Sequence, residues 1–358
     1  MKFIHCADLH LDSKLEANIG KEKAKERRNE ILLTFERIVR LAVEENVTAI
    51  LIAGDFFDTK NIAAKVRNFV WDTIENHPQI DFLYLRGNHD EKTNFTEGRN
   101  LPDNFKVFSS QWQEYRYGDV SVFGKEFLGD DAGDASLLTE LDRINIVMLH
   151  GQDINSNGCD DADRISIPSL KNRNIDYLAL GHIHSYREEM LDHRGVYCYS
   201  GCPEGRGFDE CGEKGIVLLE IEDGVIKRRF VPMAYRMLHE VEVDITGKET
   251  TTEILQEIER CTGHIPAKDM VKLILCGSYT VNSEKDFIYL SQALAGRFYF
   301  LKWKDKSRLY IDYSEYENMV SLKGEFVRTV LRGLDSETEK EQMIVLGIRA
   351  LSGEDLSI

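Results

Sequence analysis

The sequence lacks any apolar run of the ~18 residues that a membrane-spanning helix requires, although it contains 358 residues. Its first dozen residues lack the continuous apolar segment of a signal peptide, because Asp8 and two histidines interrupt them. The seven cysteines include no CxxC pair, which favours reduced thiols in a cytosolic protein over a metal or redox cluster. We therefore expect a cytoplasmic protein without a membrane partner.

Positive charge is scarce as well. The chain has 45 Lys and Arg against 62 Asp and Glu, a net charge of −17, so its overall charge does not indicate a nucleic-acid-binding protein. Any contact with DNA must therefore use a local basic surface. Residues 21–28 are basic, but the solvated first turn of a helix is the favoured explanation for them.

Short apolar runs alternate with amphipathic stretches up to Pro232, which predicts an α/β layered fold for residues 1–232. Strands are expected at residues 2–6, 48–53, 80–85, 144–149, 175–180, 196–199, 215–221 and 225–231, and helices at 22–45 and 63–76. The pattern then changes to a small α+β domain over residues 233–320 and a charged helical tail over 321–358. In this second part, strands are expected at 237–245, 271–276, 298–302 and 308–311, and helices at 251–261, 284–295 and from 322 onward.

Five of the expected strands are followed at once by Asp, Asn or His, often beside glycine. In open α/β sheets ligands bind at the carboxyl ends of the strands, and glycine lets the backbone turn sharply and approach a metal or phosphate. We therefore expect these polar side chains to gather at one rim. The seven candidate metal ligands are Asp8, His10, Asp55, Asn88, His150, His182 and His184.

The mixture of donors indicates which ions fit. Imidazole nitrogen with carboxylate and amide oxygen suits manganese, iron or zinc better than magnesium or calcium alone. Seven ligands are too many for one ion, so we expect two divalent ions joined by a bridging carboxylate, with manganese as the first choice. Two ions ~3.5–4 Å apart lower the pKa of a shared water and neutralise phosphoryl oxygens. A single histidine at a strand end is usually structural. The prediction of a two-metal site therefore rests on all five segments, taken together and in this order.

The five segments resemble the ordered signature of the calcineurin-like metallophosphoesterase superfamily, which reads D-x-H, G-D, G-N-H-D/E, H and G-H-x-H. The resemblance extends over residues 1–232. It implies a mixed α/β (α+β) fold, a two-layered β-sandwich flanked by helices, with a small α+β capping domain. It also implies that one ion is held by Asp8, His10 and His184, that the other is held by Asn88, His150 and His182, and that Asp55 bridges both.

The same resemblance gives two residues a catalytic role. His89 would stabilise the phosphate and protonate the leaving oxygen, and Asp58 would orient His89. Physical chemistry agrees, because a general acid needs a pKa near the working pH and histidine supplies one. A carboxylate partner raises that pKa and fixes the tautomer of the ring.

A narrower resemblance connects the chain to the SbcD group of DNA repair nucleases, in its shorter YhaO-type branch. It rests on residues 1–15, 50–58, 83–90 and 199–215. It implies a manganese-dependent DNA exonuclease or endonuclease that forms a subunit of an SbcCD-like repair complex. The domain at 233–320 would overhang the site and help to select DNA, and the tail at 321–358 would bind an SbcC-like coiled-coil ATPase. A homodimer through helices near the site is a further expectation.

Five residues are candidates for contact with the substrate. Arg206 and Phe208 follow the last metal-ligand strand and either line the substrate cleft or belong to a structural loop. Lys302 and Lys304 flank Trp303, a pattern that suits phosphate neutralisation and base stacking. The equally favoured alternative is one exposed strand face, because Lys302, Lys304 and Lys306 share a face at period two.

Two alternatives remain for the function. The first is a small-molecule phosphodiesterase or phosphomonoesterase that uses the same site. The second is a binding scaffold that kept the fold and lost catalysis, which is disfavoured because all the candidate ligands and His89 are present. Likewise, the tail either binds a partner or covers the capping domain.

Overall fold

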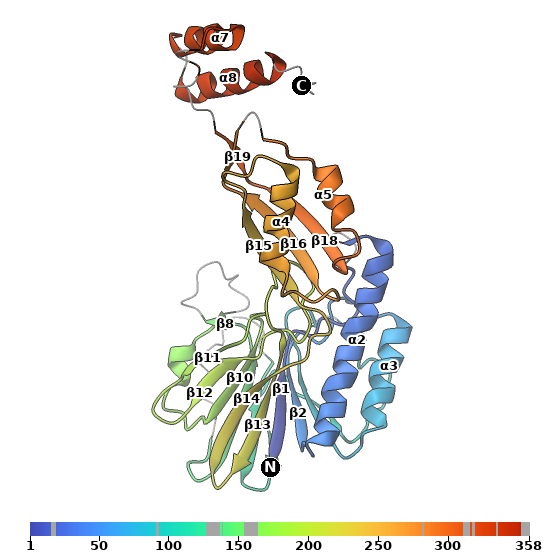
Figure 1. The fold of residues 1–358 in the computed structure, drawn as a ribbon. Helices are drawn as coiled ribbons and strands as arrows, with labels where there is room; N and C mark the ends of the chain where they lie inside the picture. Colours follow the sequence, from blue (N-terminus) through green and yellow to red (C-terminus); the bar gives the residue numbers. More distant parts are fainter. Residues whose placement is uncertain are drawn as a thin grey trace. The chain divides into compact units, whose positions relative to one another are not determined.

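The computed structural model describes the chain apart from residues 16–18, 91–92, 127–136, 138, 154–163, 281–282, 311–315, 317–318, 334–335 and 352–358. The chain divides into two compact units, Met1–Leu238 and His239–Ile358 (Figure 1). The finer division into domains at 1–232, 233–320 and 321–358, with their separate roles, stays a prediction. Among the helices of the described residues, none has the length and apolar character needed to cross a membrane.

Two six-stranded sheets form the first unit. The first sheet contains, in spatial order, β14 (Val225–Pro232), β13 (Gly215–Glu222), β1 (Lys2–Cys6), β2 (Ala49–Ala53), β3 (Asp81–Leu85) and β4 (Phe105–Val107). The second contains β11 (Arg187–Met190), β12 (Val196–Tyr199), β10 (Tyr177–Gly181), β7 (Ile144–His150), β6 (Val120–Gly124) and β5 (Gln113–Tyr117). Strands β1, β2 and β3 are parallel, and so are β7 and β10. A short pair, β8 (Gln152–Asp153) and β9 (Arg164–Ile165), lies outside both sheets.

The inner faces of the two sheets pack on each other. Their core includes Leu51 and Leu83 from the first sheet and Ile146 and Ala179 from the second, all fully buried. Because both faces of each sheet are covered, the central strands are almost continuously apolar, as their sequences indicated. The predicted two-layered β-sandwich is therefore confirmed.

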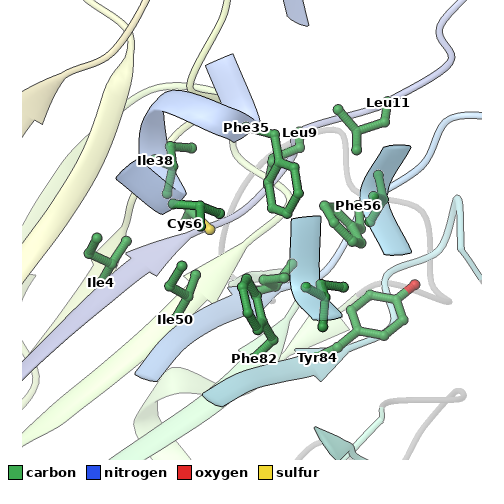
Figure 2. Close-up of a cluster of buried hydrophobic side chains, with 14 of the residues drawn as sticks. Ile4, Cys6, Leu9, Leu11, Phe35, Ile38, Ile50, Phe56, Phe82 and Tyr84 are labelled. Atoms are coloured by element: carbon green, nitrogen blue, oxygen red, sulfur yellow. The ribbon is translucent and has the colours of Figure 1, made fainter. Parts of the chain in front are cut away.

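Helices α2 (Lys21–Glu44) and α3 (Ala64–Glu75) lie along the outer face of the first sheet (Figure 1). Figure 2 shows Phe35 and Ile38 of α2 pointing toward Ile4, Ile50 and Phe82 of the strands. These apolar residues recur at helical spacing, so one face of α2 is buried while the opposite face stays polar. The helices therefore form where the sequence predicted them, within one residue at each end. A short 3₁₀ helix, η2 (Ile167–Leu170), packs on the outer face of the second sheet.

The sequence predicted no element between the third strand and residue 144, where the structure contains β4, β5 and β6. Strand β4 has only three residues, and β5 is a polar edge strand without a fully buried residue. Weak alternation on short edge strands gives little signal for β4 and β5. Strand β6 lies inside its sheet with five buried residues, and the sequence reading missed it. By contrast, the hairpin between β13 and β14 was predicted correctly, and Asp223 and Gly224 both have the positive φ of its turn.

The second unit contains a three-stranded sheet with helices on one face. Its elements are β15 (Leu238–Asp244), α4 (Thr251–Thr262), β16 (Met270–Cys276), β17 (Ser278–Tyr279), α5 (Phe287–Ala293), β18 (Phe300–Asp305), β19 (Arg308–Leu309), α7 (Leu322–Leu331) and α8 (Glu337–Leu351). Helix α4 begins at a capping box between Thr250 and Glu253, a strong N-terminal signal. Helix α5 is shorter than predicted because Asp286 caps it. The strand predicted to 311 ends at 309, and residue 311 itself lies outside the described residues.

Candidate metal centre

The residues predicted as ligands follow the carboxyl ends of five strands, three in the first sheet and two in the second. The loops that follow these strands in the sequence are hydrogen-bonded to one another. The Asp8 N–H donates to the Gly54 carbonyl at 3.0 Å, and the His182 N–H donates to Asp8 Oδ1 at 2.9 Å. The structure therefore brings residues from both sheets together at one rim.

The backbone at this rim is strained. Asp8 (φ 52°), His10 (45°), Asp55 (52°) and His182 (97°) all have positive φ. Such a conformation costs a residue other than glycine on the order of 1–3 kcal/mol and persists only where the surrounding structure imposes it. The strain turns these backbones away from ordinary strand or helix directions at the point where the predicted ligands lie, as is common at functional sites.

Three glycines allow the close approach of these loops. A Cβ on Gly54 would lie 2.0 Å from His150 Nδ1, and one on Gly87 would lie 2.2 Å from Asp55 Oδ1. A Cβ on Gly181 would lie 2.0 Å from the carbonyl oxygen of Ala53. Real Cβ contacts are never this short, so glycine is needed at each position for the ligand side chains to reach one another.

Asp8, His10 and His184 form one group of candidate ligands, with donor atoms within 4.8 Å of one another. His10 Nδ1 lies 3.1 Å from Asp58 Oδ1, and His184 Nδ1 lies 2.7 Å from Glu210 Oε1. Each carboxylate places the ring proton on Nδ1, and burial lowers the pKa of His10 and so favours its neutral form. The unprotonated His10 Nε2 and His184 Nε2 then face each other at 3.1 Å. A cation bound by both nitrogens satisfies this arrangement, so these residues fit a metal ion.

A second group consists of Asp8, Asp55 and His150, again with donor atoms within 4.8 Å. His150 Nδ1 donates to the Ala53 carbonyl at 2.9 Å, and its Nε2 faces Asn88 Oδ1 at 3.0 Å. Burial disfavours the charged ring, but the carboxylates of Asp55 and Asp8 outweigh it and raise the pKa of His150 to about 9. This group therefore favours positive charge, and its mixed nitrogen and oxygen donors fit manganese, iron or zinc.

Asp55 belongs to the second group and also lies close to His10 of the first. Its Oδ2 is 3.7 Å from His10 Nε2 and 3.5 Å from His150 Nε2, while its Oδ1 accepts the His89 N–H at 3.0 Å. Burial would raise its pKa, but the neighbouring histidines hold the pKa of Asp55 well below its usual value. It is thus a charged carboxylate within reach of both groups. The ring of His182 lies beside the second group, 5.4 Å from the ring of His150.

His89 lies at the open side of the site, and 45% of its side chain is exposed. Its Nδ1 is 3.2 Å from Asp58 Oδ1, the same oxygen that faces His10 Nδ1. The hydrogen bond to Asp58 raises the pKa of His89, and partial burial opposes this effect. One carboxylate therefore orients two rings, one at the metal ligands and one at the solvent side where a substrate would enter.

Glu210 was not predicted from the sequence. Its carboxylate is 5% exposed and accepts hydrogen bonds from His184 Nδ1, from the Arg206 backbone at 2.6 Å and from Arg206 Nη2 at 3.0 Å. Arg206 Nη1 also lies 3.3 Å from Asp58 Oδ1. Arg206 therefore joins the two carboxylates that contact the histidine ligands, and its contact with the substrate stays a prediction. Metal-binding histidines usually have such a partner, but no local pattern identifies which carboxylate it is.

Asp90 is a second residue whose role the sequence did not reveal. It is fully buried, and its carboxylate accepts the backbone N–H groups of Phe56, Phe57 and Gly87 at 2.8–3.2 Å. Burial and the nearby charge of Asp55 raise the pKa of Asp90 to about 7, although the three N–H donors oppose them. Asp90 thereby ties the loop after β3 to the loop after β2.

The other four candidates for substrate contact lie on one loop of the first unit and on one strand of the second. Phe208 is half-buried on the loop between Arg206 and Glu210. Lys302 and Lys304 are exposed on β18 of the second unit, whereas Trp303 alternates to the opposite face and packs against the core of that unit, 5.7 Å from the ring of Phe287. Strand alternation thus places Trp303 and the two lysines on opposite faces of β18, and contact of these three residues with the substrate stays a prediction.

Comparison with known proteins identifies the class of enzyme. Residues 1–186 match the model of the calcineurin-like phosphoesterase family, and the chain belongs to this family of metal-dependent hydrolases. It is 28% identical over 296 residues to the uncharacterized metallophosphoesterase YhaO of Bacillus subtilis, which covers 78% of this chain and 72% of that protein. It is 24% identical over 242 residues to the DNA double-strand break repair protein Mre11 of Sulfurisphaera tokodaii, which covers 63% of this chain and 60% of Mre11. The expected resemblance to the YhaO-type branch is thus confirmed.

Among solved structures, a dimetal phosphatase from Danio rerio aligns with a TM-score of 0.41 at 11% identity, over 65% of this chain and 96% of that one.

Proposed function

We propose that this metal-dependent phosphoesterase is a manganese-dependent DNA nuclease, cleaving phosphodiesters as exonuclease or endonuclease within an SbcCD-like repair complex in the cytoplasm. The observation that carries the proposal is the convergence of two donor groups on Asp55. It is supported by similarity to Mre11, whose name assigns it to DNA double-strand break repair.

The proposed ligand sets are those that the family resemblance implies, and the two groups support them in part. Asp8, His10 and His184 would hold one ion, and Asp55 would bridge it to the second. When bound, the ions supply Lewis-acid charge that neutralises phosphoryl oxygens and lowers the pKa of a water. The second ion would be held by Asn88, His150 and His182.

The protein's own contribution to the reaction comes from His89. Its exposed side chain lies next to the candidate ligands, with its ring centroid 4.9 Å from that of His10. Because Asp58 accepts from Nδ1, the protonated ring presents Nε2–H toward a bound phosphate and can donate that proton to the leaving oxygen. Asp58 holds the ring in this orientation, and Arg206 holds Asp58.

Helices α7 and α8 are the proposed binding region for an SbcC-like coiled-coil ATPase. Val327, Ile344 and Ile348 form the contact between the two helices. Leu322 and Leu346 remain exposed, at 72% and 49%. Exposed apolar side chains on a helix pair suit a helical partner. Substitution of both leucines by glutamate should abolish co-elution with the ATPase in size-exclusion chromatography and leave nuclease activity in place.

The proposal is tested by incubating the protein with manganese and end-labelled single-stranded or double-stranded DNA. Asp55→Ala should lose both ion binding and activity, since the bridge is removed. His89→Ala should keep ion binding, measured by calorimetry, and lose cleavage. Cleavage of bis-p-nitrophenyl phosphate or cyclic nucleotides without any cut in DNA would instead support the small-molecule phosphodiesterase. A wild-type protein that binds no manganese would contradict the proposed centre itself.

A further inference from the structure

A basic depression lies next to the candidate metal centre. It has a volume of about 380 Å³. It is lined by Asp12, Lys14, Arg28, Thr59, Lys60 and Asn61. We propose that this depression binds a phosphate group of a DNA strand whose neighbouring phosphodiester lies at the metal centre. The inference rests on the proposed DNA substrate and names a binding site for it.

The walls of the depression continue the loops that carry site residues. Asp12 is two residues beyond His10, so their Cα atoms lie within roughly 7 Å of each other. Thr59 directly follows Asp58, which contacts both His10 and His89. The two loops are held side by side, since Asp58 N–H donates to the Leu11 carbonyl at 3.1 Å. A strand bound at the metal centre therefore passes close to the depression.

The charge of the depression suits an anion. Lys14, Arg28 and Lys60 contribute three positive charges in a chain with a net charge of −17. Within the described part of the chain, neither Lys14 Nζ nor Lys60 Nζ has an ion-pair partner, and both lysines are exposed. The one acidic group, Asp12, is already engaged, because its Oδ2 accepts the Ala63 N–H at 2.8 Å.

Helix α3 adds to this potential. Ala63 is its N-cap residue, and the first turn of α3 contains no acidic residue. The positive end of the helix dipole therefore points to the side of the depression where Asp12 accepts the Ala63 N–H. Lysine ammonium groups, a guanidinium, a hydroxyl and an amide are together the donors that phosphate oxygens accept from. A second phosphate site beside the reaction centre fits a polymeric substrate and has no use in a simple monoester.

The test removes both lysines and measures the response of DNA cleavage to salt. The variant Lys14→Ala/Lys60→Ala should raise KM for a single-stranded oligonucleotide on the order of tenfold, with a smaller effect on kcat. For single strands each phosphate contact contributes about 0.7 to the slope of log binding constant against log salt. The slope should therefore fall by about 0.7 for one phosphate. Bis-p-nitrophenyl phosphate has only one phosphate. The factor by which the double-lysine variant loses kcat/KM should therefore be at least fivefold smaller on this compound than on the oligonucleotide.

A matched control removes two exposed cations elsewhere. The control is Lys227→Ala/Arg229→Ala, and both residues lie on edge strand β14. Lys227 is opposite Glu220, which in turn is opposite Lys2 at the start of β1. These positions are therefore at the end of the sheet away from the rim. This variant should keep the wild-type KM and salt slope. Oligonucleotides with and without a 5′-phosphate separate the two sources of the phosphate. An effect confined to phosphorylated ends indicates a terminal phosphate, and an effect on both substrates indicates an internal one.

Two outcomes overturn the inference in different ways. If the wild-type protein cuts DNA, and the double-lysine variant has the same KM and salt slope, the phosphate site is wrong and the DNA nuclease stands. If the wild-type protein hydrolyses bis-p-nitrophenyl phosphate but neither cuts nor binds DNA, the proposed substrate and this phosphate site fail together.

Discussion

Replacing Glu210 by glutamine tests whether the carboxylate behind His184 tunes the metal centre. The substitution keeps the size of the side chain and removes its charge. Glu210 now accepts hydrogen bonds from His184 Nδ1 at 2.7 Å and from the Arg206 backbone at 2.6 Å. An amide supplies only one acceptor oxygen, so its NH2 group must face one of these donors. The hydrogen bond that holds the ring of His184 therefore weakens or breaks.

The magnitude follows from this contact. Burial opposes the charge of Glu210, yet His184 and Arg206 keep its pKa well below the usual value, so the charged form is what the substitution removes. Loss of such a carboxylate partner costs about 10–100-fold in metal affinity, which is about 1.4–2.7 kcal/mol. Arg206 keeps Asp58 as a partner and is partly exposed, so the metal-free protein should lose about 1–3 kcal/mol. That corresponds to a fall in Tm of a few degrees.

Calorimetric titration with manganese measures the affinity independently of activity. We expect Glu210→Gln to weaken one of two binding steps and leave the other within about threefold, because Glu210 accepts a hydrogen bond from His184, which belongs to one of the two groups. The control Glu213→Gln changes an exposed carboxylate on the same loop and should match the wild type. Unchanged affinity at both steps in Glu210→Gln would refute the argument that this carboxylate supports the ligand.

Three further changes have defined outcomes. Asp58 raises the pKa of His89, so protonated His89 persists to higher pH, and Asp58→Asn should move the alkaline loss of kcat/KM to lower pH. Asp90→Ala leaves three buried N–H groups without an acceptor, and thermal melting should show a loss of about 3–5 kcal/mol, a Tm at least ~5 °C lower. Gly181→Ala places a Cβ 2.0 Å from the Ala53 carbonyl, so circular dichroism should show a comparable loss of stability. A pH profile of Asp58→Asn that equals the wild-type profile, or a melting curve of Asp90→Ala or Gly181→Ala that equals the wild-type curve, would contradict the corresponding prediction.

Local sequence determined which elements form and which strands are followed by candidate ligand side chains. Strands such as β2, with five buried residues in a row, are read directly from their apolar runs. Polar residues that follow each run are visible in the sequence, so Asp55 and His182 were predicted as ligands without knowledge of the fold. Helix α2 followed from the spacing of Phe35 and Ile38. Alternation also separates Trp303 from its neighbouring lysines, a signal that was present in the sequence.

Contacts between distant segments were decided only by the tertiary structure. Glu210 meets His184 across 26 residues, and Asp90 meets Phe56 across 34. Neither pairing leaves a periodic pattern, because a carboxylate in a loop looks the same whether it is solvated or bonded to a ligand. Only the packing of the two sheets, which brings five strand ends to one rim, determines which carboxylate lies behind which histidine. The sequence therefore specifies the donor atoms of the site, and the fold specifies their partners.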